Sequence, residues 1–375
     1  MGTADVSVTP ALPRLKSAAQ VWQIPILAWI VSRVIGCLGL VVAPTAEGKW
    51  FNSFGLTFMD GGWYRIIVTI GYPNGPMPEF STAWPFSPLY PFVADLLTRV
   101  GAPVGPSLIL VSWICALIAS IGMYELVRHR ENETVAQCAV WTLALLPGAV
   151  GQVLAYSDSM FVAALIWTLV VVDRIEWRVV NNQNTNRLWW MVGLLVLVVS
   201  ASRPNGVLIL PALLLAVWFV QRSIKNALIV VTPSVIFVVV WMIYCRNKTG
   251  DALAFLEAKN TWLETTILDF LSHPFERPAI FLHVTTFVIV AVVAAPSIQK
   301  IPRWWHAISF VLLVPSLLLG VEGMARYVSL TAPLMVMVAI SLAKWPKIYR
   351  LAFFIVAGSS FLYLAFNVVR HSWVP

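Results

Sequence analysis

Five charged residues stand beside apolar stretches of the sequence and could act on one substrate: Asp60, Arg65, Asp158, Arg203 and Arg326. A carboxylate can accept the proton of an attacking hydroxyl group, and guanidinium groups can stabilise the charge on a departing phosphate. The set therefore suggests transfer from a phosphate-linked donor, with Asp60 as the general base and no general acid. Taken singly, the acids could instead cap helices, and the arginines could reach lipid head groups.

The elements that must hold these residues are membrane helices. Of the 375 residues, 59% are hydrophobic and only 11% are charged, whereas a soluble domain carries roughly 25% charged residues. Such a chain lacks the polar surface of a soluble protein and the low hydrophobicity of a disordered one. The composition excludes both classes.

The net charge of +8 comes from cations scattered between apolar blocks. Phosphate tracking needs a clustered basic face, so we expect no nucleic-acid partner. The four cysteines suggest neither a disulfide framework nor a metal site. We expect no metal and no cofactor, although Asp60 and Asp158 could share a divalent cation if they met.

Apolar runs of about 20 residues predict an all-α polytopic membrane protein with about eleven transmembrane helices, in a single domain over residues 1–375. The expected spans are 21–42, 106–127, 135–154, 159–173, 188–202, 206–220, 226–245, 279–297, 306–321, 327–343 and 351–369. If the N-terminus is cytoplasmic, most Lys and Arg residues fall in the connections on the cytoplasmic side, as the positive-inside rule requires. We therefore expect a multi-pass protein of the cell membrane, or of the endoplasmic reticulum membrane in a eukaryote.

Two long segments, 43–105 and 246–278, fall on the external face of this topology, and most acidic residues fall there too. The sequence from Asp60 to Tyr72 predicts a short amphipathic helix at the membrane interface. Apolar residues between Leu253 and Leu271 have roughly helical spacing, so the second segment covers the site, receives the acceptor or lies on lipid. All five charged residues share this external face, which is where we expect the active site.

Four short motifs occur in order along most of the chain, and Arg326-Tyr327 follows them. They are Asp60-Gly61-Gly62-Trp63-Tyr64 with Gly71-Tyr72; Pro85-Phe86-Ser87-Pro88-Leu89-Tyr90-Pro91; Tyr156-Ser157-Asp158-Ser159-Met160-Phe161; and Ser202-Arg203-Pro204-Asn205-Gly206. In these motifs the chain resembles the PIG-V-like family, the GPI mannosyltransferase II group, with its bacterial relatives. That family consists of multi-span GT-C-type glycosyltransferases that use lipid-phosphate sugars.

The resemblance implies a mannosyltransferase that uses a polyprenyl-phosphate or dolichyl-phosphate mannose donor. It implies inversion from a β-linked donor to an α-mannoside, and a glycolipid or other lipid-linked acceptor in the bilayer. It also implies substrate-binding roles for residues in the matched motifs and the Arg326-Tyr327 step, namely Tyr64, Tyr90, Tyr156, Asp158, Arg203, Asn205, Arg326 and Tyr327. Arg65, from the external charged set, is a further expected substrate-binding residue. Two positions depart from the family pattern: Ser87 replaces a Phe and Asp158 replaces a Glu.

Two other functions fit parts of the pattern. A secondary transporter or lipid flippase also has short spans interrupted by Pro and Gly, but the halves show no hydropathy symmetry and the acids gather outside the membrane centre. A structural subunit of a membrane complex would use the 18 Trp and 19 Phe residues for packing.

Overall fold

The structure is a computed structural model that describes residues 18–42, 53–75, 82–258 and 265–369. Every regular element in these ranges is helical, which confirms the predicted all-α class. The α-helices are α1 (Ala18–Val42), α2 (Ser53–Leu56), α3 (Asp60–Ile70), α4 (Leu89–Thr98), α5 (Val104–Arg130), α6 (Glu133–Leu145), α7 (Asp158–Val180), α8 (Asn186–Ser202), α9 (Leu210–Val220), α10 (Ile224–Thr249), α11 (Ala254–Glu257), α12 (Ile267–Ser272), α13 (Pro278–Ala294), α14 (Arg303–Leu319), α15 (Met324–Leu330), α16 (Ala332–Ala343) and α17 (Lys347–Val369). Three 3₁₀ turns accompany them: η1 (Pro147–Gln152), η2 (Pro204–Ile209) and η4 (Ala295–Lys300).

The predicted number of membrane spans is wrong. Within the described ranges, five helices are long and apolar enough to cross a membrane: Trp22–Val41, Val104–Arg130, Ile224–Thr249, Pro278–Lys300 and Lys347–Val368. A sixth is possible if α15 and α16, which meet at 83°, count as one broken span. The protein is therefore an integral multi-pass membrane protein with five or six candidate spans, not eleven.

Packing inside the bundle explains the excess. The remaining apolar runs form helices of at most 17 residues, helices next to 3₁₀ turns, or α7, which carries four charged residues in its last turns. Nearly all of the first 15 residues of α7 are buried against other helices. An apolar segment is stable wherever it is kept away from water. The core of the protein provides such a place as well as lipid does.

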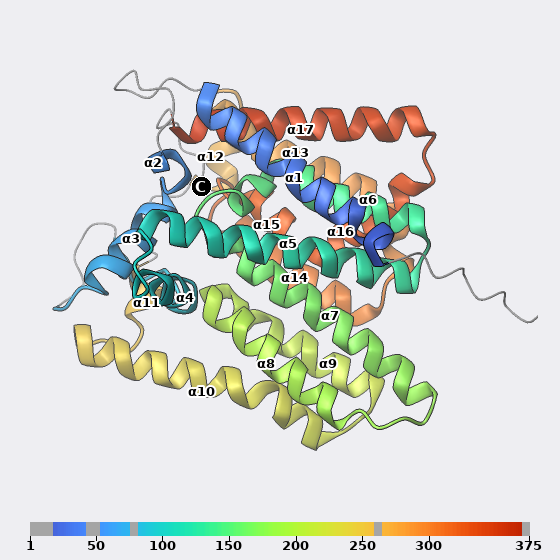
Figure 1. Ribbon diagram of the computed structural model, residues 1–375, viewed down its shortest axis with the longest axis horizontal. Coiled ribbons are helices and arrows are strands. Elements are labelled where there is room, and N and C mark those ends of the chain that lie inside the picture. Colours follow the sequence, from blue (N-terminus) through green and yellow to red (C-terminus); the bar gives the residue numbers. More distant parts are fainter. Residues whose placement is uncertain (1–17, 43–52, 76–81, 259–264, 370–375) are drawn as a thin grey trace, which may run out of the picture.

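The long helices form one bundle around this core (Figure 1). Helix α7 packs between α5 and α8, α10 covers α8, and α1 packs against both α5 and α17. Met123, Phe161, Trp189 and Met335 are among the fully buried residues of the shared core. The core fixes the ends of the helices, and the loops at those ends carry the charged residues.

Short helices gather at one end of the bundle, where α3, α4 and α11 lie together (Figure 1). They come from the two long segments predicted to be external. Ile66 and Ile70 of α3 and Phe92 of α4 are exposed apolar residues, which suits helices at a membrane interface. Residues 43–52, 76–81 and 259–264 of these segments lie outside the described residues, as do Arg14 and Lys16 of the N-terminal region.

Candidate active site

Asp60 is the first residue of α3, and its carboxylate pairs with Arg326 of α15. Met59 precedes it with a φ of +51°, and no side-chain hydrogen bond caps the helix. The N-cap interpretation of Asp60 is therefore wrong. Gly61 lets α3 approach the segment before α7, because a Cβ added there would already lie 3.5 Å from Ala155. The Asp60 carboxylate remains 18% exposed.

Arg326, in the first turn of α15, joins the two acids that the sequence placed on one face. Its Nη2 lies 2.7 Å from Asp60 Oδ2. Its Nε donates to Asp158 Oδ2 at 2.5 Å, and its Nη2 donates to Asp158 Oδ1 at 2.8 Å. Residues from three distant parts of the sequence therefore form one ion cluster.

Asp158 opens α7 and is completely buried. Arg203, which links α8 to η2, also donates to Asp158 Oδ1. Burial raises the pKa of this carboxyl, but the charges and hydrogen bonds of Arg203 and Arg326 outweigh it, so the pKa of Asp158 lies below its ordinary value of 3.8. Asp158 is an anion that holds two guanidiniums in place.

Two glycines of η1 allow this cluster to form. A Cβ at Gly148 would lie 2.0 Å from the carbonyl oxygen of Ala325, and one at Gly151 would lie 2.2 Å from Asp158 Oδ2. Both distances are far below van der Waals contact, so only glycine fits. The sequence analysis missed these positions, although a Gly-x-x-Gly step directly after Pro147 was the available signal.

Two predicted tyrosines lie against the arginines. The Arg326 guanidinium carbon is 4.7 Å from the centroid of the Tyr156 ring, and that of Arg203 is 5.8 Å from the Tyr327 ring. Cation–π contact of this kind stabilises a guanidinium in a low-dielectric place. Tyr156 and Tyr327 thus orient the two positive groups.

Other predicted residues lie in a second layer or apart. The Tyr64 hydroxyl donates to Ser157 Oγ at 2.7 Å, next to Asp158. Tyr90 is fully buried, and its ring lies edge-on to that of Tyr64 with the centroids 4.7 Å apart. Its hydroxyl donates to the Leu108 carbonyl at 2.7 Å and so joins α4 to α5. Arg65 follows Asp60 by five residues and lies on a different face of α3, since five residues turn a helix by about 500°.

Several polar atoms near the cluster are buried without a hydrogen-bond partner in the part of the chain that the structure describes. They are Arg203 Nε, both amide atoms of Asn205 and both ring nitrogens of His283. His283, on α13, lies within electrostatic range of Arg326. Buried polar groups are rarely left unpaired, so this group of atoms indicates a place for a polar ligand. The sequence analysis overlooked His283, which stands alone in an apolar run.

The predicted sharing of a cation by Asp60 and Asp158 does not match their surroundings, because the guanidinium of Arg326 lies between the two carboxylates. Within the described residues, no three His, Cys, Asp or Glu side chains are placed to hold a metal ion. The positive charge in this site comes from arginine.

Part of the chain resembles a known family. Residues 85–245 match the family model described as dolichyl-phosphate-mannose-protein mannosyltransferase. The matched segment contains Asp158, Arg203 and Asn205 but not Asp60 or Arg326. A search of curated proteins found no match.

The fold matches that of an oligosaccharyltransferase from Archaeoglobus fulgidus, solved with a tethered acceptor peptide that contains the NVT sequon. The TM-score is 0.54 at 12% identity, over 96% of this chain and 56% of the archaeal one. The chain therefore shares the fold of this archaeal oligosaccharyltransferase. A second structure of the archaeal enzyme, with an inhibitory peptide and a dolichol-phosphate, gives a TM-score of 0.52 at 12% identity over 95% and 56% of the two chains. The chain thus spans about half the length of the structures it matches.

Proposed function

We propose that the protein is a glycosyltransferase that moves mannose from a polyprenyl-phosphate mannose donor to a glycolipid or other lipid-linked acceptor, with Asp60 as the general base. The observation that carries the proposal is the cluster in which Arg326 joins Asp60 to Asp158. The match to a dolichyl-phosphate-mannose family over residues 85–245 supports the class of donor. The motif resemblance to the GPI mannosyltransferase II group supports a glycolipid acceptor and an α-linked product.

The two carboxylates suit different roles. Both oxygens of Asp158 accept from guanidiniums and the residue is buried, so it positions Arg203 and Arg326. Asp60 is partly exposed, and its Oδ2 meets a single guanidinium. Its carboxylate is therefore the group that can approach a substrate hydroxyl and accept its proton.

The reaction is a single displacement at the anomeric carbon of the donor. The acceptor oxygen forms a bond to C1 while the bond from C1 to the phosphate oxygen breaks, and the phosphate leaves with that electron pair. The acceptor proton passes to Asp60. Arg203, whose Nε has no partner among the described residues, faces the phosphate together with Arg326 and stabilises the charge that develops on it.

A groove on the same side of the protein suits the lipid tail of the donor. It has a volume of about 390 Å³ and lies between α3, α4 and α10, lined mainly by apolar residues such as Ile67, Phe237 and Trp241. Asp60 and Ile67 share one face of α3, since a spacing of seven residues is almost two helical turns. A polyprenyl chain in this groove would leave its phosphate near the charged cluster, on the external side of the membrane.

The test is mannose transfer by the purified protein in detergent, with polyprenyl-phosphate mannose as donor. We expect release of polyprenyl phosphate and the appearance of mannose on an alkyl mannoside acceptor. A matched assay with a nucleotide-linked mannose should give no product. Transfer from the nucleotide donor alone would refute the proposed donor class.

A further inference from the structure

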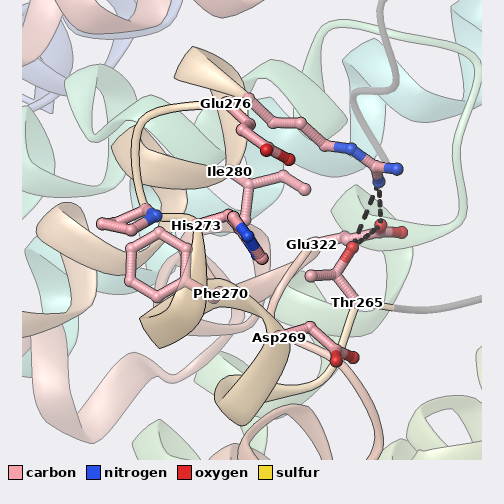
Figure 2. A pocket seen from close by; sticks show the side chains of 9 residues that line it. Thr265, Asp269, Phe270, His273, Glu276, Ile280 and Glu322 are labelled. Carbon is pink, nitrogen blue, oxygen red and sulfur yellow. Dashed lines mark hydrogen bonds and ion pairs between the residues drawn. The ribbon is translucent and has the colours of Figure 1, made fainter.

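A pocket of about 270 Å³ lies between the second long segment and the approach to α15, and no residue of the ion cluster lines it (Figure 2). Its lining includes Asp269, His273, Glu276, Arg277 and Glu322, from α12, the loop after it and the approach to α15. Phe270 and Ile280 add apolar surface. The pocket is smaller than the ~300–1,000 Å³ typical of drug-sized ligands, so it suits a single small polar group.

Glu322 is the most unusual residue of this lining, because it is charged and only 4% exposed. Its Oε1 accepts from the Thr265 hydroxyl at 2.5 Å and from Arg277 Nη1 at 3.3 Å (Figure 2). Its Oε2 is buried and has no hydrogen-bond partner among the described residues. An unpaired carboxylate oxygen is costly, and a donor from a bound molecule would remove that cost.

The charges of the pocket select the kind of molecule. Three carboxylates, from Asp269, Glu276 and Glu322, face one guanidinium, from Arg277. This excess of negative charge repels a phosphate, so the pocket does not compete with Arg203 and Arg326 for the donor. Carboxylates accept hydrogen bonds from hydroxyl groups, and the surface of Phe270 can pack against the carbon face of a ring.

The position of the pocket fits an acceptor held close to the reacting centre. Glu322 precedes Arg326 by four residues, in the turn that leads into α15, and four residues of chain span at most about 14 Å. The backbone N–H of Val321 donates to the Thr265 carbonyl at 3.0 Å and joins the α12 segment to the approach to α15. Next to the pocket residues, Leu268, Leu271 and Phe275 are exposed, so this segment can rest on lipid.

We infer that this pocket binds an uncharged, hydroxyl-rich sugar ring of a glycolipid acceptor. The inference rests on the proposed function and adds a place for the second substrate. Glu322 and Glu276 accept hydrogen bonds from the ring hydroxyls, and Arg277 donates to them. The apolar side chains of α12 keep the lipid anchor of the acceptor in the membrane.

The test is binding of octyl α-mannoside to the full-length protein in detergent, followed by ligand-observed NMR titration. We expect Glu322→Gln to weaken this binding at least 10-fold, because an amide cannot replace the charged acceptor. Glu276→Gln should weaken the binding of octyl α-mannoside as well. This variant retains the interaction of Arg277 with Glu322, so its effect does not depend on that pair. Glu176→Gln makes the same chemical change in the last turns of α7, where Glu176 pairs with Arg130 outside both sites, and should leave the binding unchanged.

Two results would overturn the inference: no saturable binding by the wild-type protein, or equal affinities in wild-type, Glu322→Gln and Glu276→Gln proteins with unchanged melting temperatures. Release of polyprenyl phosphate from the donor into water is measured in parallel. If that release persists in the wild type while mannoside binding is absent, the acceptor pocket is wrong and the donor chemistry stands. If release is absent while the mannoside binds, the proposed function fails instead.

Discussion

Replacement of Asp60 by Asn is the sharpest test of the proposed chemistry. The amide has nearly the same size and its oxygen can still accept the hydrogen bond from Arg326, whose Nη2 lies 2.7 Å from Asp60 Oδ2. The carboxylate is partly exposed, so loss of its charge should change the free energy of unfolding by only about 1 kcal/mol. Asn cannot accept the acceptor proton, and loss of a general base lowers rates by roughly 10²–10⁴-fold. That corresponds to about 2.7–5.4 kcal/mol of transition-state stabilisation.

The assay compares initial rates of mannose transfer by wild-type and Asp60→Asn proteins, with melting temperature and donor affinity measured on the same preparations. Donor affinity should stay nearly constant, because Arg203 and Arg326 hold the phosphate. Asp60→Ala is a less informative change, since it also removes the hydrogen bond to Arg326. A folded Asp60→Asn protein with near-normal turnover would refute the role of Asp60 as the base.

Three further predictions follow from the same cluster and its setting. Asp158→Asn should lower the free energy of unfolding by roughly 3–5 kcal/mol, measured by thermal or denaturant unfolding, because it leaves two guanidiniums without their buried anion; an unchanged melting temperature would contradict the anchoring role. Arg203→Gln should weaken donor binding by roughly 1.5–3 kcal/mol, and Arg203→Lys should restore only part of it because Lys lacks the planar fork; equal affinities in titrations of all three proteins would place the phosphate elsewhere. In a cysteine-free background, a cysteine at Asn74 should react with an impermeant maleimide on intact cells and one at Asn182 should not; the reverse pattern would put the active site on the cytoplasmic side.

Much of the site was predictable from the sequence because a charged residue beside an apolar run needs a partner. Asp60, Asp158, Arg203 and Arg326 were selected for their shared sidedness, and the structure places all four in one cluster. Their pairing was not predictable, because 168 residues separate Arg326 from Asp158. No local pattern reports which of several external acids an arginine will meet.

The roles of single aromatic residues were less accessible. Tyr90 stands in a family-like motif, yet its hydroxyl donates to the Leu108 carbonyl and it is fully buried. A motif reports that a residue is required and does not separate packing from substrate contact. The same limit explains the span count, since α7 satisfies the apolar criterion with neighbouring helices instead of lipid.

The arrangement around Arg326 divides the work of the site between two acids. Asp158 cannot act as a base while both of its oxygens hold guanidiniums, and its buried position keeps those guanidiniums fixed before substrate arrives. Preorganised positive charge is most effective in a place from which water is excluded. Asp60 lies at the exposed edge of the same cluster, where it can meet an acceptor hydroxyl. Gly148 and Gly151 let η1 lie close to α15 and to the Asp158–Arg326 pair. The two glycines therefore support the separate roles of Asp158 and Asp60 without touching a substrate.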